Sequence, residues 1–182
     1  MKITLAGISG SGKSTISRHL ETKFNLKRYN MGDLRRKMAL ERGMNIDEFN
    51  KLGEKESWTD KDVDDYQKTL GKKEENFVID GRLSWHFIPE SIKLFLKVDS
   101  KVGAQRIFDA KRESERAYLN VEEVEKEIAS RIESDRKRYE NIYGVDPYAL
   151  EHYDIIIDTS NLSEEQMREE VEKAIREFEF KA

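Results

Sequence analysis

Short apolar runs recur along the chain and alternate with longer stretches of helical periodicity. The clearest runs lie at residues 3–6, 77–80, 92–98 and 155–158, and residues 27–31 form a weaker fifth candidate. Apolar strands that alternate with helices are typical of a parallel sheet covered on both faces. The pattern therefore predicts a three-layer α/β fold built around a five-stranded parallel sheet.

A helical insert is predicted at residues 32–72, between the second and third strands. Asn45 is expected to cap a helix here. A later helix in the insert should bury Val63, Tyr66 and Leu70 and end at Gly71. The insert is longer than a crossover between neighbouring strands requires.

The second half of the chain predicts two long helices. One runs from residue 121 to about residue 143, and the other begins after Ser163 as its cap. The segment at 109–116 is highly charged and lacks apolar periodicity, which favours a mobile segment before the first of these helices. Repeats and interdomain linkers are absent from the sequence, so we expect one domain.

Composition narrows the function classes. The chain has 182 residues, of which 38% are charged, and its formal net charge is −4. A general nucleic-acid binder would carry a basic stripe, so this balance argues against nucleic acid as a partner. The absence of cysteine excludes disulfides and thiolate metal sites. Without a signal-like or membrane-spanning apolar run, the expected location is cytoplasmic, with no membrane partner.

The most informative stretch follows the first predicted strand and precedes a helix. It fits the P-loop pattern of Gly, four residues and Gly-Lys-Ser in the context that the motif requires. Its glycines let successive backbone N–H groups converge on a phosphate, and the helix start adds partial positive charge. Lys13 is placed to reach the β and γ phosphates of ATP, and Ser14 to hold Mg²⁺. The predicted ATP-binding residues are Gly7, Ile8, Ser9, Gly10, Ser11, Gly12, Lys13, Ser14 and Thr15.

Acidic residues stand at the ends of several predicted strands. Asp33, Asp80 and Asp158 fall with the P-loop at the carboxyl edge of the sheet, where ligands of such folds bind. Asp80 ends a buried strand, which is where P-loop proteins place the acid that helps to hold Mg²⁺. We therefore predict Ser14 and Asp80 as the magnesium residues, although an N-cap role for Asp80 is the alternative.

Arginines supply a second set of candidate phosphate ligands. Arg131, Asp135 and Arg138 share one helix face at the edge of its apolar stripe, where a carboxylate can steady two guanidinium forks. Arg82 follows Asp80-Gly81, and Arg36 lies one turn beyond Asp33. Four arginines exceed what one triphosphate requires, which favours phosphoryl transfer between two phosphate-bearing molecules over simple hydrolysis.

The segments at 7–15, 32–36 (Gly-Asp-Leu-Arg-Arg), 80–82 (Asp-Gly-Arg) and 131–138 (Arg-x3-Asp-x2-Arg) together resemble nucleoside monophosphate kinases. The match is closest to cytidylate kinases of the short archaeal type and covers nearly the whole chain. The resemblance implies one domain of the P-loop NTPase fold. Its core would comprise 1–31, 73–108 and 121–182, with a monophosphate-binding insert at 32–72 and a lid at 109–120.

The resemblance also implies a reaction and roles for individual residues. ATP, with Mg²⁺, would phosphorylate CMP and dCMP by direct in-line transfer, in a protein expected to be a monomer. Lys13, Arg131, Arg138 and Asp80 would be catalytic, and Arg112, with Arg106 as a second candidate, would close over ATP. Bacterial cytidylate kinases carry a further Asp directly after Asp-Gly-Arg, where this chain has Leu83. The implied acceptor-binding residues are Asp33, Arg36, Asp64, Gln67, Arg82, Arg131, Asp135 and Arg138.

The residues alone also allow other functions. The same scaffold could phosphorylate UMP, AMP or a small metabolite, or could act as an RNA-associated or ribosome-associated ATPase. A GTPase-like switch is disfavoured because no strand is followed by Asn-Lys-x-Asp. Assays across several acceptors, and of ATP turnover with RNA, would separate these hypotheses.

Overall fold

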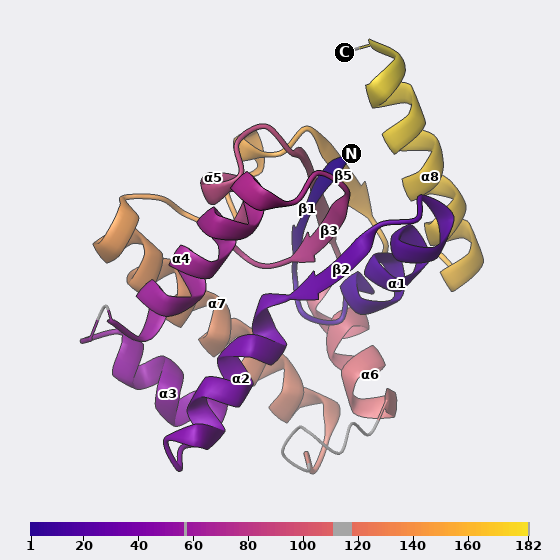
Figure 1. Cartoon of the computed structure of the whole chain (residues 1–182). Coiled ribbons are helices and arrows are strands. Elements are labelled where there is room, and N and C mark those ends of the chain that lie inside the picture. Colours follow the sequence, from indigo (N-terminus) through magenta and orange to yellow (C-terminus); the bar gives the residue numbers. More distant parts are fainter. Residues whose placement is uncertain (57, 111–117, 182) are drawn as a thin grey trace.

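The structure is a computed structural model that describes residues 1–56, 58–110 and 118–181. Within these residues, five parallel strands form one sheet in the order β2-β3-β1-β4-β5 (Figure 1). This confirms the predicted α/β fold and its parallel sheet. The strands are β1 (Lys2–Gly7), β2 (Lys27–Asn30), β3 (Phe77–Asp80), β4 (Ile92–Lys97) and β5 (Ile155–Asp158).

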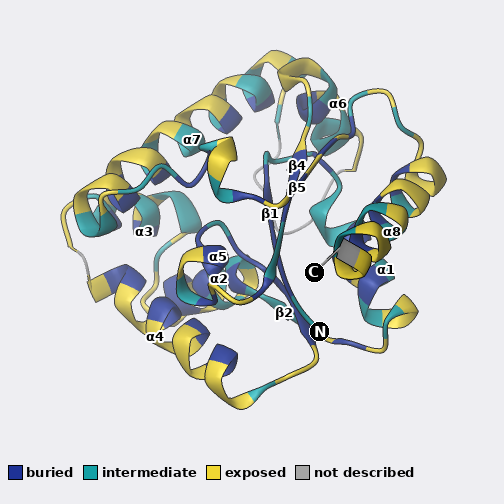
Figure 2. Ribbon diagram, turned by 90° about the horizontal axis from the view of Figure 1, so that it is seen from above, coloured by how far each residue is buried: buried dark blue, intermediate teal, exposed yellow. Residues whose placement is uncertain are grey.

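Helices cover both faces of the sheet. On one face lie α1 (Lys13–Lys23) and α8 (Glu164–Lys181), and on the other lie α5 (Ser84–Phe87) and α7 (Val121–Tyr143), with α6 (Ser100–Ala110) against α7 (Figure 2). A short 3-10 helix, η1 (Leu150–His152), precedes β5. The buried sides of these helices face the sheet and their exposed sides face outward, as the three-layer prediction requires.

The insert between β2 and β3 consists of α2 (Met31–Glu41), α3 (Ile46–Gly53) and α4 (Trp58–Lys73). Its own apolar cluster includes Phe49 and Val63 and joins the sheet through Phe77 and Ile79. Phe49 is fully buried, and burial of such a side chain stabilises a fold by about 2–3 kcal/mol. The insert is therefore packed onto the core and not loosely appended.

Two helix starts that the sequence predicted, at Asn45 and at Ser163, are confirmed. Asn45 accepts hydrogen bonds from the backbone N–H of Asp47 and Glu48, and the Glu48 carboxylate accepts from Asn45 in return. This reciprocal capping box fixes the start of α3. Ser163 likewise accepts a hydrogen bond from the backbone N–H of Gln166, which confirms it as a cap of α8.

Two predictions within α4 are wrong. Gly71 does not end the helix, which continues to Lys73. A Cβ at residue 71 would lie 2.9 Å from Ile88 Cγ1, so the glycine serves close packing instead. Tyr66 is 42% exposed and contacts Tyr29 by its ring edge. The periodicity placed it on the buried face, but it lies at the rim of that face.

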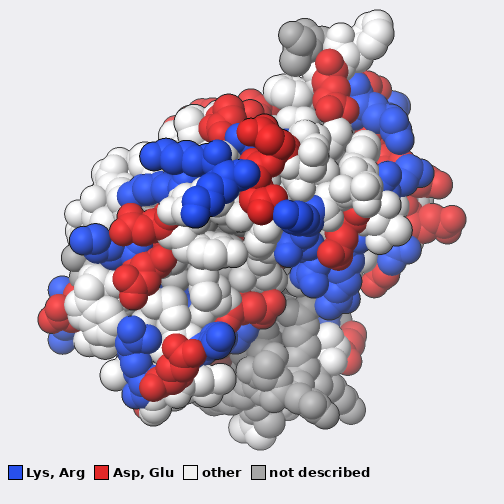
Figure 3. Space-filling view, viewed as in Figure 1, with Lys and Arg blue, Asp and Glu red and all other residues white. Residues whose placement is uncertain are grey.

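The predicted lid at 109–120 begins inside α6, which extends to Ala110. Residues 111–117 lie outside the described residues, and Asn120 caps α7. No helix in the described part of the chain is long and apolar enough to cross a membrane. On the face shown in Figure 3, basic and acidic side chains are interspersed and do not form one large patch of either sign.

Candidate active site

The glycine-rich loop joins β1, the middle strand of the sheet, to α1. Gly10 has a φ of 83°, and a Cβ there would lie 2.3 Å from the carbonyl oxygen of Gly103 in α6. Only glycine permits both this conformation and this approach. Lys13 Nζ donates hydrogen bonds to the carbonyl oxygens of Gly7 and Ile8, at 3.0 and 2.8 Å. The ammonium group is thus held against the loop, whose amides can bind a phosphate.

The connection between β5 and α8 supports this loop from the side. Thr159 Oγ1 donates to the carbonyl oxygen of Ser11 at 3.1 Å. Arg106 in turn donates to the carbonyl oxygens of Thr159 and Leu162, at 2.8 and 3.3 Å. Arg106 therefore ties α6 to the β5–α8 connection, a structural role that the sequence did not indicate. Arg112, the other predicted ATP contact beyond the loop, lies outside the described residues.

Asp80 ends β3 in register with Leu5 of β1, immediately beside the loop. The side chain is buried. Burial raises the pKa of the Asp80 carboxyl, while the positive charges of Lys13 and Arg82 act to lower it. A hydroxyl from Ser14 and a carboxylate from Asp80 are oxygen donors, and Mg²⁺ in phosphoryl-transfer sites typically takes one or two such ligands beside water and phosphates. These residues fit the predicted ion.

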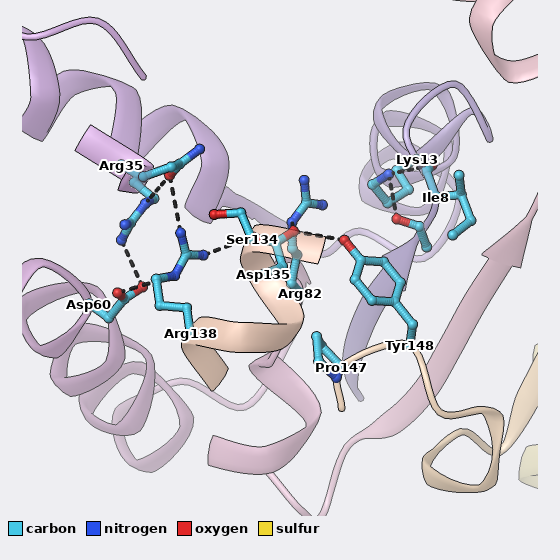
Figure 4. A network of polar contacts seen from close by, with 12 residues as sticks. Ile8, Lys13, Arg35, Asp60, Arg82, Ser134, Asp135, Arg138, Pro147 and Tyr148 are labelled. Atoms are coloured by element: carbon cyan, nitrogen blue, oxygen red, sulfur yellow. Dashed lines mark hydrogen bonds and ion pairs between the residues drawn. The ribbon is translucent and has the colours of Figure 1, made fainter. Parts of the chain in front are cut away.

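Asp135 stands at the centre of a buried polar network (Figure 4). Its carboxylate pairs with Arg82, accepts a hydrogen bond from Arg138 Nη2 at 2.8 Å and accepts another from the Tyr148 hydroxyl at 2.7 Å. Burial acts to lower the pKa of Arg82, but Asp135 leads the groups that together raise it. The structure thus brings Arg82 and Arg138 together at Asp135, whereas the helical spacing predicted Arg131 and Arg138 as the two arginines beside this carboxylate. In Figure 4, Lys13 lies on the opposite side of Tyr148 from Arg138.

The network continues into the insert through residues that the sequence reasoning missed. Asn50 Oδ1 accepts from Arg35 Nε at 2.8 Å and from Arg138 Nη1 at 3.3 Å. Asp60 bridges the same two arginines, at 2.8 Å from Arg35 Nη1 and 3.3 Å from Arg138 Nε. Burial lowers the pKa of Arg35, and so does the charge of Arg138. Both terminal nitrogens of the Arg138 guanidinium donate hydrogen bonds to protein oxygens, whereas Nε lies near Asp60 without a hydrogen bond among the described residues.

Two predicted arginines lie outside this network. Arg131 pairs with Glu127 at 2.5 Å and with Asp47 at 3.6 Å. Arg36 pairs with Asp33 at the start of α2, where the side chains of both residues are largely exposed. The structure therefore separates the predicted acceptor-binding arginines into two that meet at Asp135, Arg82 and Arg138, and two that pair with other carboxylates. Their roles toward a ligand stay predictions.

Asp64 and Gln67, two of the predicted acceptor-binding residues, lie on the inner face of α4. The Asp64 carboxylate accepts hydrogen bonds from the Tyr143 hydroxyl and from Gln67 Nε2, the latter at 3.3 Å. Ser84 donates to Gln67 Oε1 at 2.6 Å. Both ends of the Gln67 amide are therefore fixed by protein partners. Tyr143 and Ser84 were not among the predicted site residues.

Comparison with known proteins identifies the family. A model of the cytidylate kinase-like family matches residues 2–161. The chain belongs to this family. It is 41% identical to a cytidylate kinase of Pyrococcus abyssi over 174 residues, which cover 95% of this chain and 92% of that protein. It is 36% identical to a cytidylate kinase of Methanothermobacter thermautotrophicus over 165 residues, 91% of this chain and 99% of the relative. The chain is therefore a kinase, as its motifs predicted.

Solved structures agree on the fold. A shikimate kinase from Aquifex aeolicus matches with a TM-score of 0.59 at 22% identity and covers 97% of this chain, which covers 96% of that structure. A shikimate kinase from Bacteroides thetaiotaomicron matches with a TM-score of 0.65 at 16% identity, with 98% of each chain covered. At these identities the likeness concerns architecture alone. It shows that this chain shares the α/β fold of these two structures.

Proposed function

We propose that this kinase transfers the γ-phosphoryl group of ATP to CMP, and also to dCMP, by direct in-line displacement. The observation that carries the proposal is the presence of two separate groups of basic side chains in one chain of the cytidylate kinase-like family. One is the loop with Lys13, and the other is the network of Arg82, Asp135 and Arg138 on the far side of Tyr148. A donor and an acceptor phosphate would meet between them.

The proposed mechanism relies on positioning and charge. Lys13 and the loop amides would hold the donor phosphates, while Arg82 and Arg36 would grip the acceptor phosphate. Arg131 and Arg138 would act on the phosphoryl group in transfer, and Arg138 must exchange some of its protein partners to do so. No added base is required, because a monophosphate is already a competent nucleophile at neutral pH.

Magnesium would be held by Ser14 and Asp80. The ion, when bound, would offset the charge that accumulates on the phosphate oxygens. Asp80 is suited to this role because its buried carboxylate lies beside the loop. Asp33, one turn before Arg36 in the same helix, would lie on the acceptor side as the partner of that arginine.

A panel of acceptors tests this function directly. ADP formation should be fastest with CMP and dCMP and slower with UMP, AMP and shikimate. A faster reaction with AMP or shikimate would overturn the assignment to cytidine nucleotides. ATP turnover that rises with RNA and ignores every monophosphate would instead favour the RNA-associated ATPase.

Substitution of Arg138 tests the proposed phosphate role. Arg138→Ala should lower kcat with CMP by about 100-fold or more, the usual effect of removing one donor from a charge-stabilising site. Lys137→Ala is the matched control, because this neighbour pairs with Glu133 at 2.9 Å on the solvent side of α7. Arg131→Ala should behave like Arg138→Ala. If both arginine variants retained the kcat of the control, neither arginine would belong to the site.

A further inference from the structure

Asp64 is a buried carboxylate that has no cationic partner among the described residues. Its side chain is 2% exposed, as is that of Asp60 one turn earlier in α4. Asp60 and Asp135 each contact two arginines. Within the described residues, no Lys, Arg or His nitrogen lies within 4.0 Å of Asp64. A buried charge is normally paired, so this carboxylate lacks the compensation that its two neighbours have.

Asp64 instead accepts hydrogen bonds from two neutral side chains, and a third element holds one of them in place. The Tyr143 hydroxyl of α7 and the Gln67 amide of α4 both donate to it. Ser84 of α5 fixes Gln67 by donating to its Oε1 at 2.6 Å. Ser84 in turn lies against the Asp-Gly-Arg turn, because a Cβ at Gly81 would be 2.2 Å from Ser84 Oγ and 3.3 Å from Gln67 Oε1.

This cluster lies at a defined place relative to the arginine network. Asp60, which pairs with Arg138, is four residues before Asp64, or about 6 Å along the axis of α4. Ser84 follows Arg82 by two residues. Helix α4 therefore carries both a partner of Arg138 and, one turn later, the oriented carboxylate of Asp64. The Asp-Gly-Arg turn carries Arg82, which we propose to bind the acceptor phosphate. A nucleoside monophosphate bridges such a spacing, with its phosphate at one end and its base at the other.

We propose that the charge on Asp64 selects the pyrimidine base. Ionised, Asp64 accepts a hydrogen bond from the 4-amino group of cytosine; protonated, it donates one to the 4-carbonyl oxygen of uracil. Tyr143 is the positioning residue that favours the ionised, cytosine-selecting form. The proposal rests on the proposed function and adds a mechanism of base choice in a chain that has Leu83 after its Asp-Gly-Arg turn.

The surroundings of Asp64 place its titration near neutral pH. Burial raises its pKa to about 6, while the Tyr143 hydrogen bond lowers it. Asp60 raises the pKa through its charge, and Lys68 of α4 and Arg35 of α2 lower it. The phenol of Tyr143 stays neutral over the working range because burial and Asp64 raise its own pKa.

His86 of α5, whose ring lies 5.5 Å from that of Tyr143, is the remaining titratable neighbour. Burial lowers the pKa of His86. Substitution of His86 therefore provides a control for titration close to the cluster but outside it.

The test is the ratio of kcat/KM for CMP to kcat/KM for UMP, measured from pH 5 to pH 8. Ionisation of the two phosphates is alike and cancels in the ratio. We expect the ratio to rise by about tenfold as pH increases through the Asp64 titration, near the lower range of what one base-edge contact contributes. In Asp64→Asn the ratio should be lower at pH 8 and independent of pH.

Tyr143→Phe separates the inference from a merely structural role. Loss of the hydroxyl should move the midpoint of the ratio to higher pH without abolishing the change. Asp65→Asn, an exposed neighbour on α4, and His86→Asn should leave the midpoint unchanged. A flat ratio in the wild type, or an unchanged profile in Asp64→Asn, would overturn the inference while leaving CMP phosphorylation intact. Failure to phosphorylate CMP at all would instead remove the proposed function.

Discussion

At the scale of single residues, the uncompensated burial of Asp64 has an energetic consequence. Its pKa is raised to about 6 from an ordinary value near 4. The folded protein therefore holds the proton more tightly than the unfolded chain does. Tighter proton binding in the folded state adds to the free energy of unfolding. By linkage, this stabilisation is fully present below about pH 4 and is lost as pH rises through about 6. At neutral pH the ionised carboxylate costs the fold free energy.

Asp64→Asn should reverse this cost. Relative to wild type, the variant should gain free energy of unfolding as pH rises from 4 to 7, by up to about 3 kcal/mol for a shift of two pKa units. Chemical denaturation at several pH values measures the difference. Asp65→Asn is the control, since its carboxylate is exposed and pairs only with Lys68 at 3.3 Å. A difference between Asp64→Asn and wild type that does not vary with pH would contradict the burial argument.

The sequence predicted where a residue lies in the fold when a motif fixed its position, as for Lys13 in the P-loop and Asp80 at the end of β3. It was not predictable for the adjacent arginines at 35 and 36. Arg36 pairs with Asp33, three residues away, whereas the partner of Arg35 is Asp60, distant in the sequence. Consecutive residues of a helix point about 100° apart. Which of the two is buried depends on α4, and no local pattern gives that information.

At the scale of elements, α4 presents a polar stripe to the interior. Asp60, Asp64 and Gln67 follow at i, i+4 and i+7 and share a face with the buried Val63 and Leu70. Polar residues on the apolar face were the signal that could have identified Asp60. The resemblance pointed to two members of the stripe, and the structure adds the third.

Asp60→Asn tests how far this stripe holds the insert to α7. Loss of the charge would leave Arg35 and Arg138 buried with less compensation, and we expect a loss of about 3 kcal/mol in the free energy of unfolding. Asp65→Asn, on the outer side of α4, should cost less than 1 kcal/mol. Urea denaturation of both variants gives the comparison. Equal stabilities would mean that the Asp60 pairs contribute nothing to docking of the insert.

The approach of the P-loop to α6 supports a second prediction at this scale. Gly103 lies inside α6, where alanine would by itself favour the helix by up to about 1 kcal/mol. Its Cβ would, however, lie 2.9 Å from the carbonyl oxygen of Ser9, so the loop would have to shift. We expect Gly103→Ala to raise KM for ATP while leaving KM for CMP nearly unchanged. Gln105→Ala, an exposed neighbour in α6, is the control, and an unaltered KM for ATP would contradict the steric argument.

At the scale of the whole molecule, the order of the strands determines where the site lies. The chain passes from β1 to the edge strand β2, returns to β3 beside β1 and then crosses to β4 and β5 on the other side. The strands β3 and β4 therefore flank β1, and the P-loop emerges where the order reverses. The number of strands and their parallel sense followed from apolar runs separated by helices. Their order did not, because it depends on how each crossover packs. That order puts Asp80 beside the loop.

The same arrangement predicts two separable ligand sites. ATP and CMP, each at about 100 times its Kd, should each raise the free energy of unfolding by about 2.7 kcal/mol. Lys13→Ala should abolish most of the stabilisation by ATP and retain that by CMP, because Lys13 belongs to the loop. Arg82→Ala should show the converse pattern, since Arg82 belongs to the network around Asp135. Thermal unfolding with each nucleotide measures both effects. Loss of both stabilisations in each variant would show that the two groups form one inseparable site, and would contradict separate donor and acceptor subsites.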